Sequence, residues 1–126
     1  MSRTVPHLAL TPTDQAIYIT ADDRDTAVGG NMSHVYHIDS VDPAAGMPRL
    51  GEIRFQRGPV KEVGVNGVTN EALIAICIDR LEGAQEGPFA SEDNSTAIEA
   101  LKSASEALAK RTRDRMARGV EGQSKA

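Results

Sequence analysis

The 126-residue sequence contains few of the residues on which several common functions depend. It has one cysteine, no tryptophan, two tyrosines and two phenylalanines. The single cysteine, Cys77, cannot close an internal disulfide or form a zinc cage, which fits a reducing compartment. No apolar run approaches the roughly 20 residues of a membrane span, and the start of the chain lacks the apolar stretch of a signal peptide. We therefore expect a soluble protein that is not exported.

The low aromatic content and a formal net charge of −4 argue against a partner such as DNA or RNA. Proteins that bind long nucleic acids follow the phosphates with basic residues and stack bases on aromatic rings. The charge is unevenly distributed, however. Residues 110–118 hold five basic residues and one acid, a local net charge of +4, so the rest of the chain carries −8. This distribution suits a compact ligand with few phosphates better than a long polyanion.

The first half of the chain has the pattern of a β-sheet. Short apolar stretches alternate with polar residues and are separated by Gly, Pro, Asp and Ser, a pattern typical of strands and turns. Three strands are predicted at 16–20, 34–39 and 52–56. The connectors between them are short enough for an antiparallel meander.

In the second half the apolar residues follow a helical period. Thr69 or Asn70 can cap a first helix, whose residues 72–81 are apolar nearly all round. We expect such a helix to be buried on several sides. A second start signal at 91–95 opens a long helix that ends at Gly119.

The predicted fold class is α+β, a small N-terminal antiparallel β-sheet followed by a C-terminal two-helix hairpin. A chain of this length makes one domain, 1–126. Within it we assign about 14–60 to the β-meander, about 69–119 to the helical hairpin and 120–126 to a frayed tail.

The basic segment at the end of the second helix is the clearest candidate site. Arg111, Arg115 and Arg118 fall on one helical stripe, for which only Asp114 is a nearby counter-ion. Neighbouring guanidiniums without counter-ions favour an anion, either a carboxylate from elsewhere or a ligand phosphate. Basic residues in a last turn also complement the helix dipole, so a purely structural role is the alternative.

Other charges of the hairpin have simpler interpretations. The opposite flank of the second helix is predicted to form two intrahelical pairs, Lys102–Glu106 and Glu106–Lys110. Four acids surround the hairpin loop: Glu86, Glu92, Asp93 and Glu99. A second subunit packed antiparallel would bring this acidic end to the basic end of its neighbour, in a closed dimer.

Two residues near the hairpin loop have both a structural and a ligand-binding interpretation. Asn94 is first a candidate N-cap, and it can alternatively present a donor and an acceptor to a nucleobase or ribose. Phe89 either pins the loop onto the hairpin, which is the commoner case, or offers a stacking face.

No catalytic or metal site is predicted. His34 and His37 are three residues apart in a predicted strand and point to opposite faces, so they cannot share a metal without a bulge. His7 lies in an N-terminus expected to be loose, and Cys77 is expected to be a small buried residue. The glycines at 58, 64 and 67 lack the spacing of a phosphate-cradling loop. A binding protein is the simplest interpretation.

Three stretches of the sequence carry a resemblance to a known family. They are the run 55–73, the stretch Ile78-Asp79-Arg80-Leu81, and the ending 110–122 with its Lys110-Arg111-Thr112-Arg113-Asp114-Arg115. The sequence resembles the phage Thoeris anti-defence (Tad) family, which shares its helical-hairpin domain with anti-CBASS cyclic-nucleotide sponges. The similarity is specific over about 55–122.

The resemblance implies a non-enzymatic phage protein that acts in the cytoplasm of the infected bacterium. It would bind and withhold a cyclic nucleotide immune signal, glycocyclic ADP-ribose or a cyclic di- or trinucleotide, without a cofactor. Members of the family form homo-oligomers, dimers and often hexamers, with ligand between subunits. Arg57 is expected to line a second nucleotide site between hairpins. The alternatives are a phosphodiesterase that degrades such a signal and a non-binding oligomerisation or accessory module.

The resemblance also assigns individual residues to the ligand. Arg111 and Arg115 match two arginines that hold the phosphates, and Asn94 matches a polar contact to the ligand. Ala84 stands where relatives carry an aromatic that stacks on the base. Loss of that stacking partner would cost about 1–3 kcal/mol unless Phe89 or another chain supplies a ring.

Overall fold

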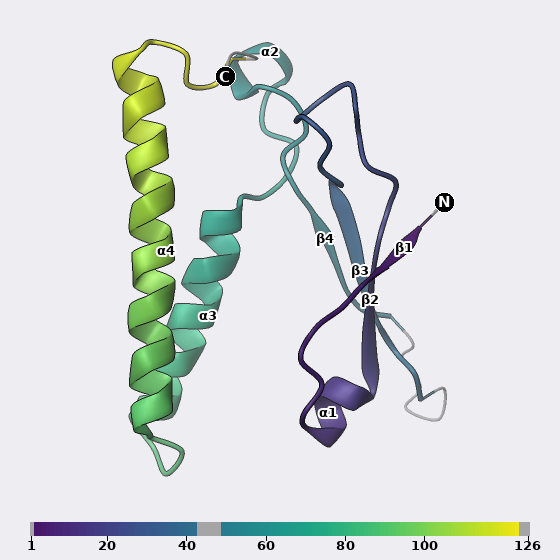
Figure 1. Cartoon of the computed structure of the whole chain (residues 1–126), viewed down its shortest axis with the longest axis vertical. Coiled ribbons are helices and arrows are strands. Elements are labelled where there is room, and N and C mark those ends of the chain that lie inside the picture. The colour runs from purple at the N-terminus through teal and green to yellow at the C-terminus, as the bar shows by residue number, and fades with distance from the viewer. Residues whose placement is uncertain (1, 43–48, 124–126) are drawn as a thin grey trace. The chain divides into compact units, whose positions relative to one another are not determined.

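The computed structural model describes residues 2–42 and 49–123 (Figure 1). The chain divides into two compact units. Unit 1 comprises Met1–Gly58 and Val63–Gly67, and unit 2 comprises Pro59–Glu62 and Val68–Ala126. The α+β fold class is confirmed, since unit 1 is built on a sheet and unit 2 on a helical hairpin.

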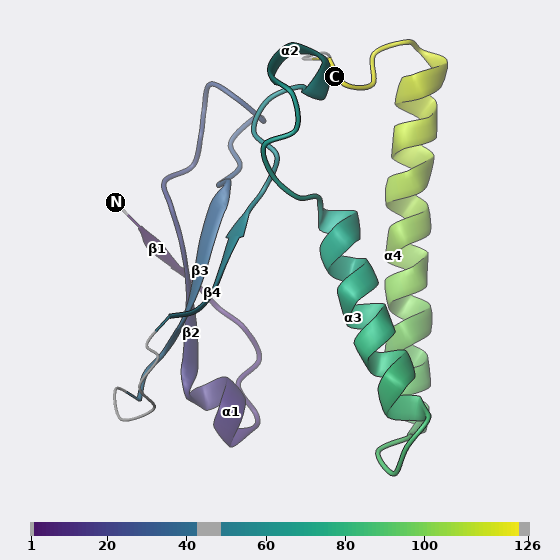
Figure 2. The same cartoon turned by 180° about the vertical axis from the view of Figure 1, so that it is seen from behind.

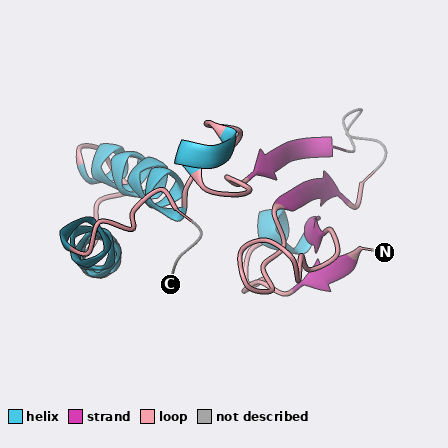
Figure 3. Cartoon of the chain, turned by 90° about the horizontal axis from the view of Figure 1, so that it is seen from above, coloured by secondary structure: helices cyan, strands magenta, loops and turns pink. Residues whose placement is uncertain are grey.

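Unit 1 contains a four-stranded antiparallel sheet in the order β1-β2-β3-β4 (magenta in Figure 3). The three predicted strands correspond to β2, β3 and β4, and α1 lies between β1 and β2. The bounds are β1 Arg3–Val5, α1 Pro12–Gln15, β2 Ile17–Ala21, β3 Val35–Ser40 and β4 Arg49–Arg54.

The first strand, β1, was not predicted from the sequence. Its three residues pair with the end of β2, Arg3 opposite Ala21 and Val5 opposite Ile19. His7 follows this strand, and its Nε2 lies 2.9 Å from the carbonyl oxygen of Asp14. The prediction of a loose N-terminus at His7 is therefore wrong, because a strand pair on one side and α1 on the other hold the segment.

The sheet has one apolar and one polar face, as the alternation of its residues requires. On the apolar face Ala21 is completely buried, and the rings of Tyr36 and Phe55 meet edge to face with centroids 5.6 Å apart. On the polar face His37 and Asp39 of β3 contact Arg49 of β4. The face on which a side chain lies was thus set by its place in the alternation.

Gln56 and Asn66 brace the loop that follows the sheet. Gln56 Nε2 donates to the carbonyl oxygen of Gly64 at 2.8 Å, and Gln56 Oε1 accepts from the N–H of Asn66 at 2.8 Å. The Asn66 amide then pairs with the backbone of Arg57 through both its oxygen and its nitrogen. The backbone of Arg57 is consequently fixed in unit 1. A one-turn helix, α2 (Val60–Val63), lies within this loop.

Unit 2 is the predicted hairpin of two antiparallel helices, α3 (Asn70–Gln85) and α4 (Glu92–Ala117), which lie side by side (Figures 1 and 2). Thr69 caps α3, as predicted, by accepting from the N–H of Ala72 at 3.2 Å. Ser91 caps α4 by accepting from the N–H of Asn94 at 3.1 Å. Within the described residues no helix is long and apolar enough to cross a bilayer.

The expectation that the apolar helix α3 is buried on several sides is wrong for the single chain. No residue of α3 is buried, Ile76 is 62% exposed, and Cys77 is exposed instead of buried. A hairpin offers each helix one neighbour, so only one face of α3 is covered by α4. Ile98, 7% exposed, is the buried residue of α4. The helix surface therefore remains apolar and open.

Gly67 supplies a test of the braced loop. A Cβ at this position would lie 2.3 Å from the backbone carbonyl carbon of Phe55, so Gly67→Ala forces the chain apart. We expect a loss of at least about 2 kcal/mol in the free energy of unfolding, measured by urea denaturation. Gly51→Ala is the matched control, because a Cβ there meets no atom within 4 Å. Equal stability of the two variants would contradict the tight contact.

Candidate ligand-binding site

The basic end of α4 carries Arg111 and Arg115, the two arginines that are predicted to bind the phosphates of the ligand. They lie one turn apart, and Arg111 is exposed to solvent. Within residues 2–42 and 49–123, Arg111 has no ion-pair partner. An exposed guanidinium in this state can take up a phosphate without first giving up a carboxylate.

Arg115 is engaged differently from the prediction. Its side chain is 18% exposed, and its Nε donates to Glu121 Oε2 at 2.8 Å. Its Nη2 donates to the carbonyl oxygens of Val120 and Gln123 at 2.9 and 3.0 Å. Asp114 is thus not the only carboxylate near the stripe, and residues 120–123 form a bonded turn instead of a frayed tail. Residues 124–126 of the predicted tail lie outside the described part of the chain.

The acids along α4 also form other pairs than predicted. Asp114 accepts from Lys110 Nζ at 2.8 Å, and this hydrogen bond, with the nearby positive charges, lowers the pKa of Asp114. The predicted Lys102–Glu106 and Glu106–Lys110 pairs are replaced by Lys102–Glu82 at 3.9 Å and Arg113–Glu106 at 3.5 Å. Lys102 pairs with a residue of the other helix, and Glu106 pairs with a residue two turns further along α4. These partners replace the ones at the i, i+4 spacing.

The opposite end of the hairpin is held together by Gln85 and Asn94. Asn94 Nδ2 donates to Gln85 Oε1 at 3.1 Å and to the carbonyl oxygen of Phe89 at 2.9 Å. Gln85 Nε2 donates to Ser91 O at 2.9 Å and to Ser95 Oγ at 2.7 Å. The preferred prediction for Asn94, an N-cap, is wrong because Ser91 fills that role. The amide of Asn94 instead clamps the loop.

Phe89 does not pin this loop. Its side chain is 80% exposed, so the ring offers an open face at the tip of the hairpin. Ala84, predicted to replace a stacking aromatic of relatives, lies half-buried at the end of α3, next to Gln85. The tip therefore presents one exposed ring beside a polar clamp.

An acidic depression of about 370 Å³ lies at the same end of the hairpin. Its charged lining comes from Glu82, Glu86 and Glu99, and Ile98 supplies an apolar part of the lining. Gln85 was not singled out from the sequence, although it lines this depression and makes hydrogen bonds to both Ser91 and Ser95. The one sign of this role in the sequence is its position: a glutamine, whose amide can both donate and accept hydrogen bonds, at the end of an apolar helix.

The predicted ligand residues of unit 2 do not meet within one chain. Asn94 and Arg111 belong to the same helix and are 17 positions apart, which corresponds to about 25 Å along its axis. Ala84 and Phe89 lie at the Asn94 end, and Arg115 lies at the Arg111 end. A cyclic dinucleotide cannot reach both ends of one hairpin.

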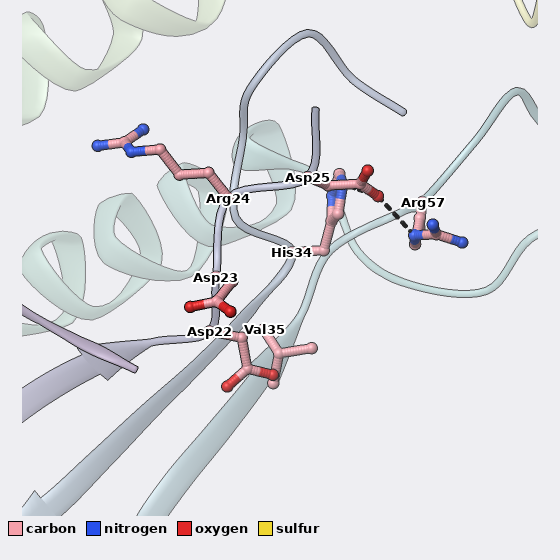
Figure 4. Close-up of a pocket in the computed structure, with 7 residues that line it drawn as sticks. All are labelled: Asp22, Asp23, Arg24, Asp25, His34, Val35 and Arg57. Atoms are coloured by element: carbon pink, nitrogen blue, oxygen red, sulfur yellow. Dashed lines mark hydrogen bonds and ion pairs between the residues drawn. The ribbon is translucent and has the colours of Figure 1, made fainter. Parts of the chain in front are cut away.

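Arg57, the predicted residue of a second nucleotide site, lies in unit 1 beside a pocket of about 350 Å³ (Figure 4). Its Nε donates to Asp25 Oδ2 at 2.7 Å, and the same carboxylate oxygen is 3.3 Å from His34 Nε2. Hydrogen bonds from the backbone N–H of Val28, and then from Arg57, lower the pKa of Asp25. Arg57 thus pairs with a charged carboxylate, whereas Arg24 points away from this group (Figure 4).

The histidines do not form a metal site in the described part of the chain. His34 contacts Asp25, and His37 lies 3.3 Å from Glu52 and 3.7 Å from Asp22. No group of three or more His, Cys, Asp or Glu side chains among residues 2–42 and 49–123 is arranged to hold a metal ion.

Comparison with known proteins places the hairpin in a family. Residues 47–113, more than half of the chain, match the family model described as Acb2/Tad1, hairpin domain. The chain belongs to the Acb2/Tad1 hairpin family. The match includes Arg57, Ala84, Phe89, Asn94 and Arg111, and it ends before Arg115.

A known phage protein matches this chain over a longer stretch than the family model does. The chain is 46% identical over 94 residues to "Thoeris anti-defense 1" of Bacillus phage SBSphiJ7. The aligned part covers 75% of this chain and 62% of that protein. The chain thus spans less than two thirds of the relative's length.

The hydrogen bonds of the Gln85 side chain predict how the tip of the hairpin responds to mutation. Gln85→Ala removes the hydrogen bonds to Asn94, Ser91 and Ser95, so we expect faster amide hydrogen exchange at 86–91 and a loss of about 1–2 kcal/mol in unfolding free energy. Ser103→Ala, a change at an exposed position of α4 away from the loop, is the control. Unchanged exchange at 86–91 would show that the loop does not depend on Gln85.

Proposed function

We propose that this chain is a phage anti-defence protein that binds and sequesters a cyclic nucleotide immune signal without cleaving it. The ligand class is glycocyclic ADP-ribose or a cyclic di- or trinucleotide, and the place of action is the cytoplasm of the infected bacterium. Membership of the Acb2/Tad1 hairpin family and the similarity to a Thoeris anti-defence protein support this role.

The observation that carries the proposal is the state of Arg111. Its guanidinium is exposed and has no ion-pair partner among the described residues, one turn from Arg115. A cyclic dinucleotide or an ADP-ribose derivative brings about two negative charges close together, and arginine binds such phosphates through two parallel hydrogen bonds. The end of α4 therefore has the charge and geometry for a small anionic ligand.

The site is completed by a second copy of the chain. Because α4 separates Asn94 from Arg111 by about 25 Å, one ligand can contact both residue types only if they come from different subunits. Antiparallel packing of two hairpins brings the tip of one to the basic end of the other. The exposed apolar surface of α3, including Ile76, is available for such packing.

At the tip, Phe89 supplies the stacking face that Ala84 lacks. Phe89 is 80% exposed, and its backbone carbonyl oxygen accepts a hydrogen bond from Asn94 Nδ2. Stacking of a base on an aromatic ring contributes about 1–3 kcal/mol. In this assignment phosphates meet Arg111 and Arg115, and a base meets Phe89 of the other subunit.

The acidic depression favours a second candidate function, a non-binding oligomerisation module. Glu82, Glu86 and Glu99 at the tip are complementary to the basic end of a neighbouring α4. In that case Arg111 would hold subunits together by ion pairs and would bind no ligand.

Replacement of Arg111 separates the two functions. We expect Arg111→Gln to weaken the binding of glycocyclic ADP-ribose by about 10- to 100-fold, measured by calorimetric titration, while the oligomeric state in light scattering is unchanged. Arg113→Gln is the matched control, since Arg113 lies on the other flank and pairs with Glu106. Loss of the oligomer in Arg111→Gln, with no binding by the unmodified chain, would favour the oligomerisation module.

The same preparation tests sequestration against degradation. The protein is incubated with the signal and heat-denatured, and the released compound is examined by mass spectrometry. Intact signal agrees with sequestration, and hydrolysed product would instead indicate a phosphodiesterase.

A further inference from the structure

The guanidinium of Arg115 already donates hydrogen bonds to the turn formed by residues 120–123. Glu121 accepts from Nε, and the carbonyl oxygens of Val120 and Gln123 both accept from Nη2. All three N–H groups on the Nε and Nη2 side of the guanidinium are therefore donated within the chain. The three distances lie between 2.8 and 3.0 Å, as expected for well-formed hydrogen bonds.

This side of the guanidinium is an edge that a phosphate would use. The Nε–H and one Nη2–H are parallel, and carboxylates and phosphates accept from such a pair in the same bidentate manner. The Glu121 carboxylate thus stands where a phosphate oxygen would stand. A phosphate bound to this edge and the turn at 120–123 exclude each other.

The turn is a defined structure, and it also contacts the α2 segment within unit 2. The N–H of Val120 donates to the carbonyl oxygen of Arg115 at 3.0 Å, and Gly122 adopts a φ of 78°, which favours glycine. The N–H of Lys61 donates to the carbonyl oxygen of Gly122 at 3.2 Å. Arg115 therefore holds one side of the turn, and Lys61 holds the other.

The Glu121 side of this pair is open to solvent. The Glu121 side chain is 42% exposed, whereas that of Arg115 is 18% exposed. An incoming anion can thus reach the guanidinium by displacing the more accessible partner. The exposed carboxylate favours this exchange, because water and salt weaken an ion pair on its open side.

We propose that Glu121 is a built-in competitor for the ligand phosphate at Arg115. Binding exchanges the Glu121 carboxylate for a phosphate and releases residues 120–123 from α4, which also frees the backbone N–H of Lys61. Without ligand the turn shields Arg115 from other anions, and Arg111 makes the first contact with the phosphate. This inference rests on the proposed function.

Removal of the Glu121 charge tests the competition. Glu121→Gln is titrated with glycocyclic ADP-ribose in the full chain, and we expect binding about three- to tenfold tighter than in the unmodified chain. Glu106→Gln is the matched control, because Glu106 pairs with Arg113 on the opposite flank of the same helix, and its affinity should not change.

Hydrogen exchange of residues 120–123 supplies the second measurement. We expect these amides to exchange faster when the ligand is bound, while the amides of 100–110 do not. Unchanged or weaker binding by Glu121→Gln, or unchanged protection at 120–123, would overturn the competition. Absence of binding by the unmodified chain would refute the proposed function, and the inference with it, whereas binding that ignores Glu121 would refute the inference alone.

Discussion

The length of α4 is the constraint on which the proposed site depends. A continuous 26-residue helix, capped by Ser91, holds Asn94 and Arg111 at a fixed separation of about 25 Å. No change of side-chain conformation closes that gap. A hairpin that binds a small cyclic ligand with residues from both ends therefore requires a second hairpin, so the proposed function makes dimerisation a condition of ligand binding.

The charge and hydropathy of the hairpin agree with this requirement. The basic end carries Arg111, and the tip carries a depression lined by Glu82, Glu86 and Glu99. Between the two ends, α3 leaves an apolar surface exposed in the single chain. In the proposed dimer, opposite charges at the ends would set an antiparallel orientation, and the apolar surface would supply the burial that a stable pair needs. The net charge of −4 conceals this arrangement, because the two ends nearly compensate each other.

Much of the fold follows from the sequence, since period and capping signals are local. The α+β order, β2 to β4 and both long helices were predicted, whereas β1 was not, because three residues give no period. The apolar content of α3 indicated a covered surface, but hydropathy does not specify whether the same chain or another covers it. The prediction of a buried Cys77 failed for that reason.

The contacts of the site were harder to predict, because they depend on where the chain reverses. Arg115 meets Glu121 only because Gly119, with a φ of 71°, turns the chain back after the helix ends. Gln85 and Asn94 meet across the hairpin loop and not along a helix. Helical spacing placed the arginines on one stripe, but it could not identify the partners that lie beyond the end of α4.

The most direct test of a site shared by two copies is a mixing experiment. Chains carrying Asn94→Ala and chains carrying Arg111→Ala are each titrated with glycocyclic ADP-ribose, then unfolded together, refolded and titrated again. Neither variant alone should bind well. A mixed dimer combines Asn94 of one chain with Arg111 of the other at one of its two sites, so binding should return at a fraction of the sites. A mixture that binds no better than its components would contradict the shared site.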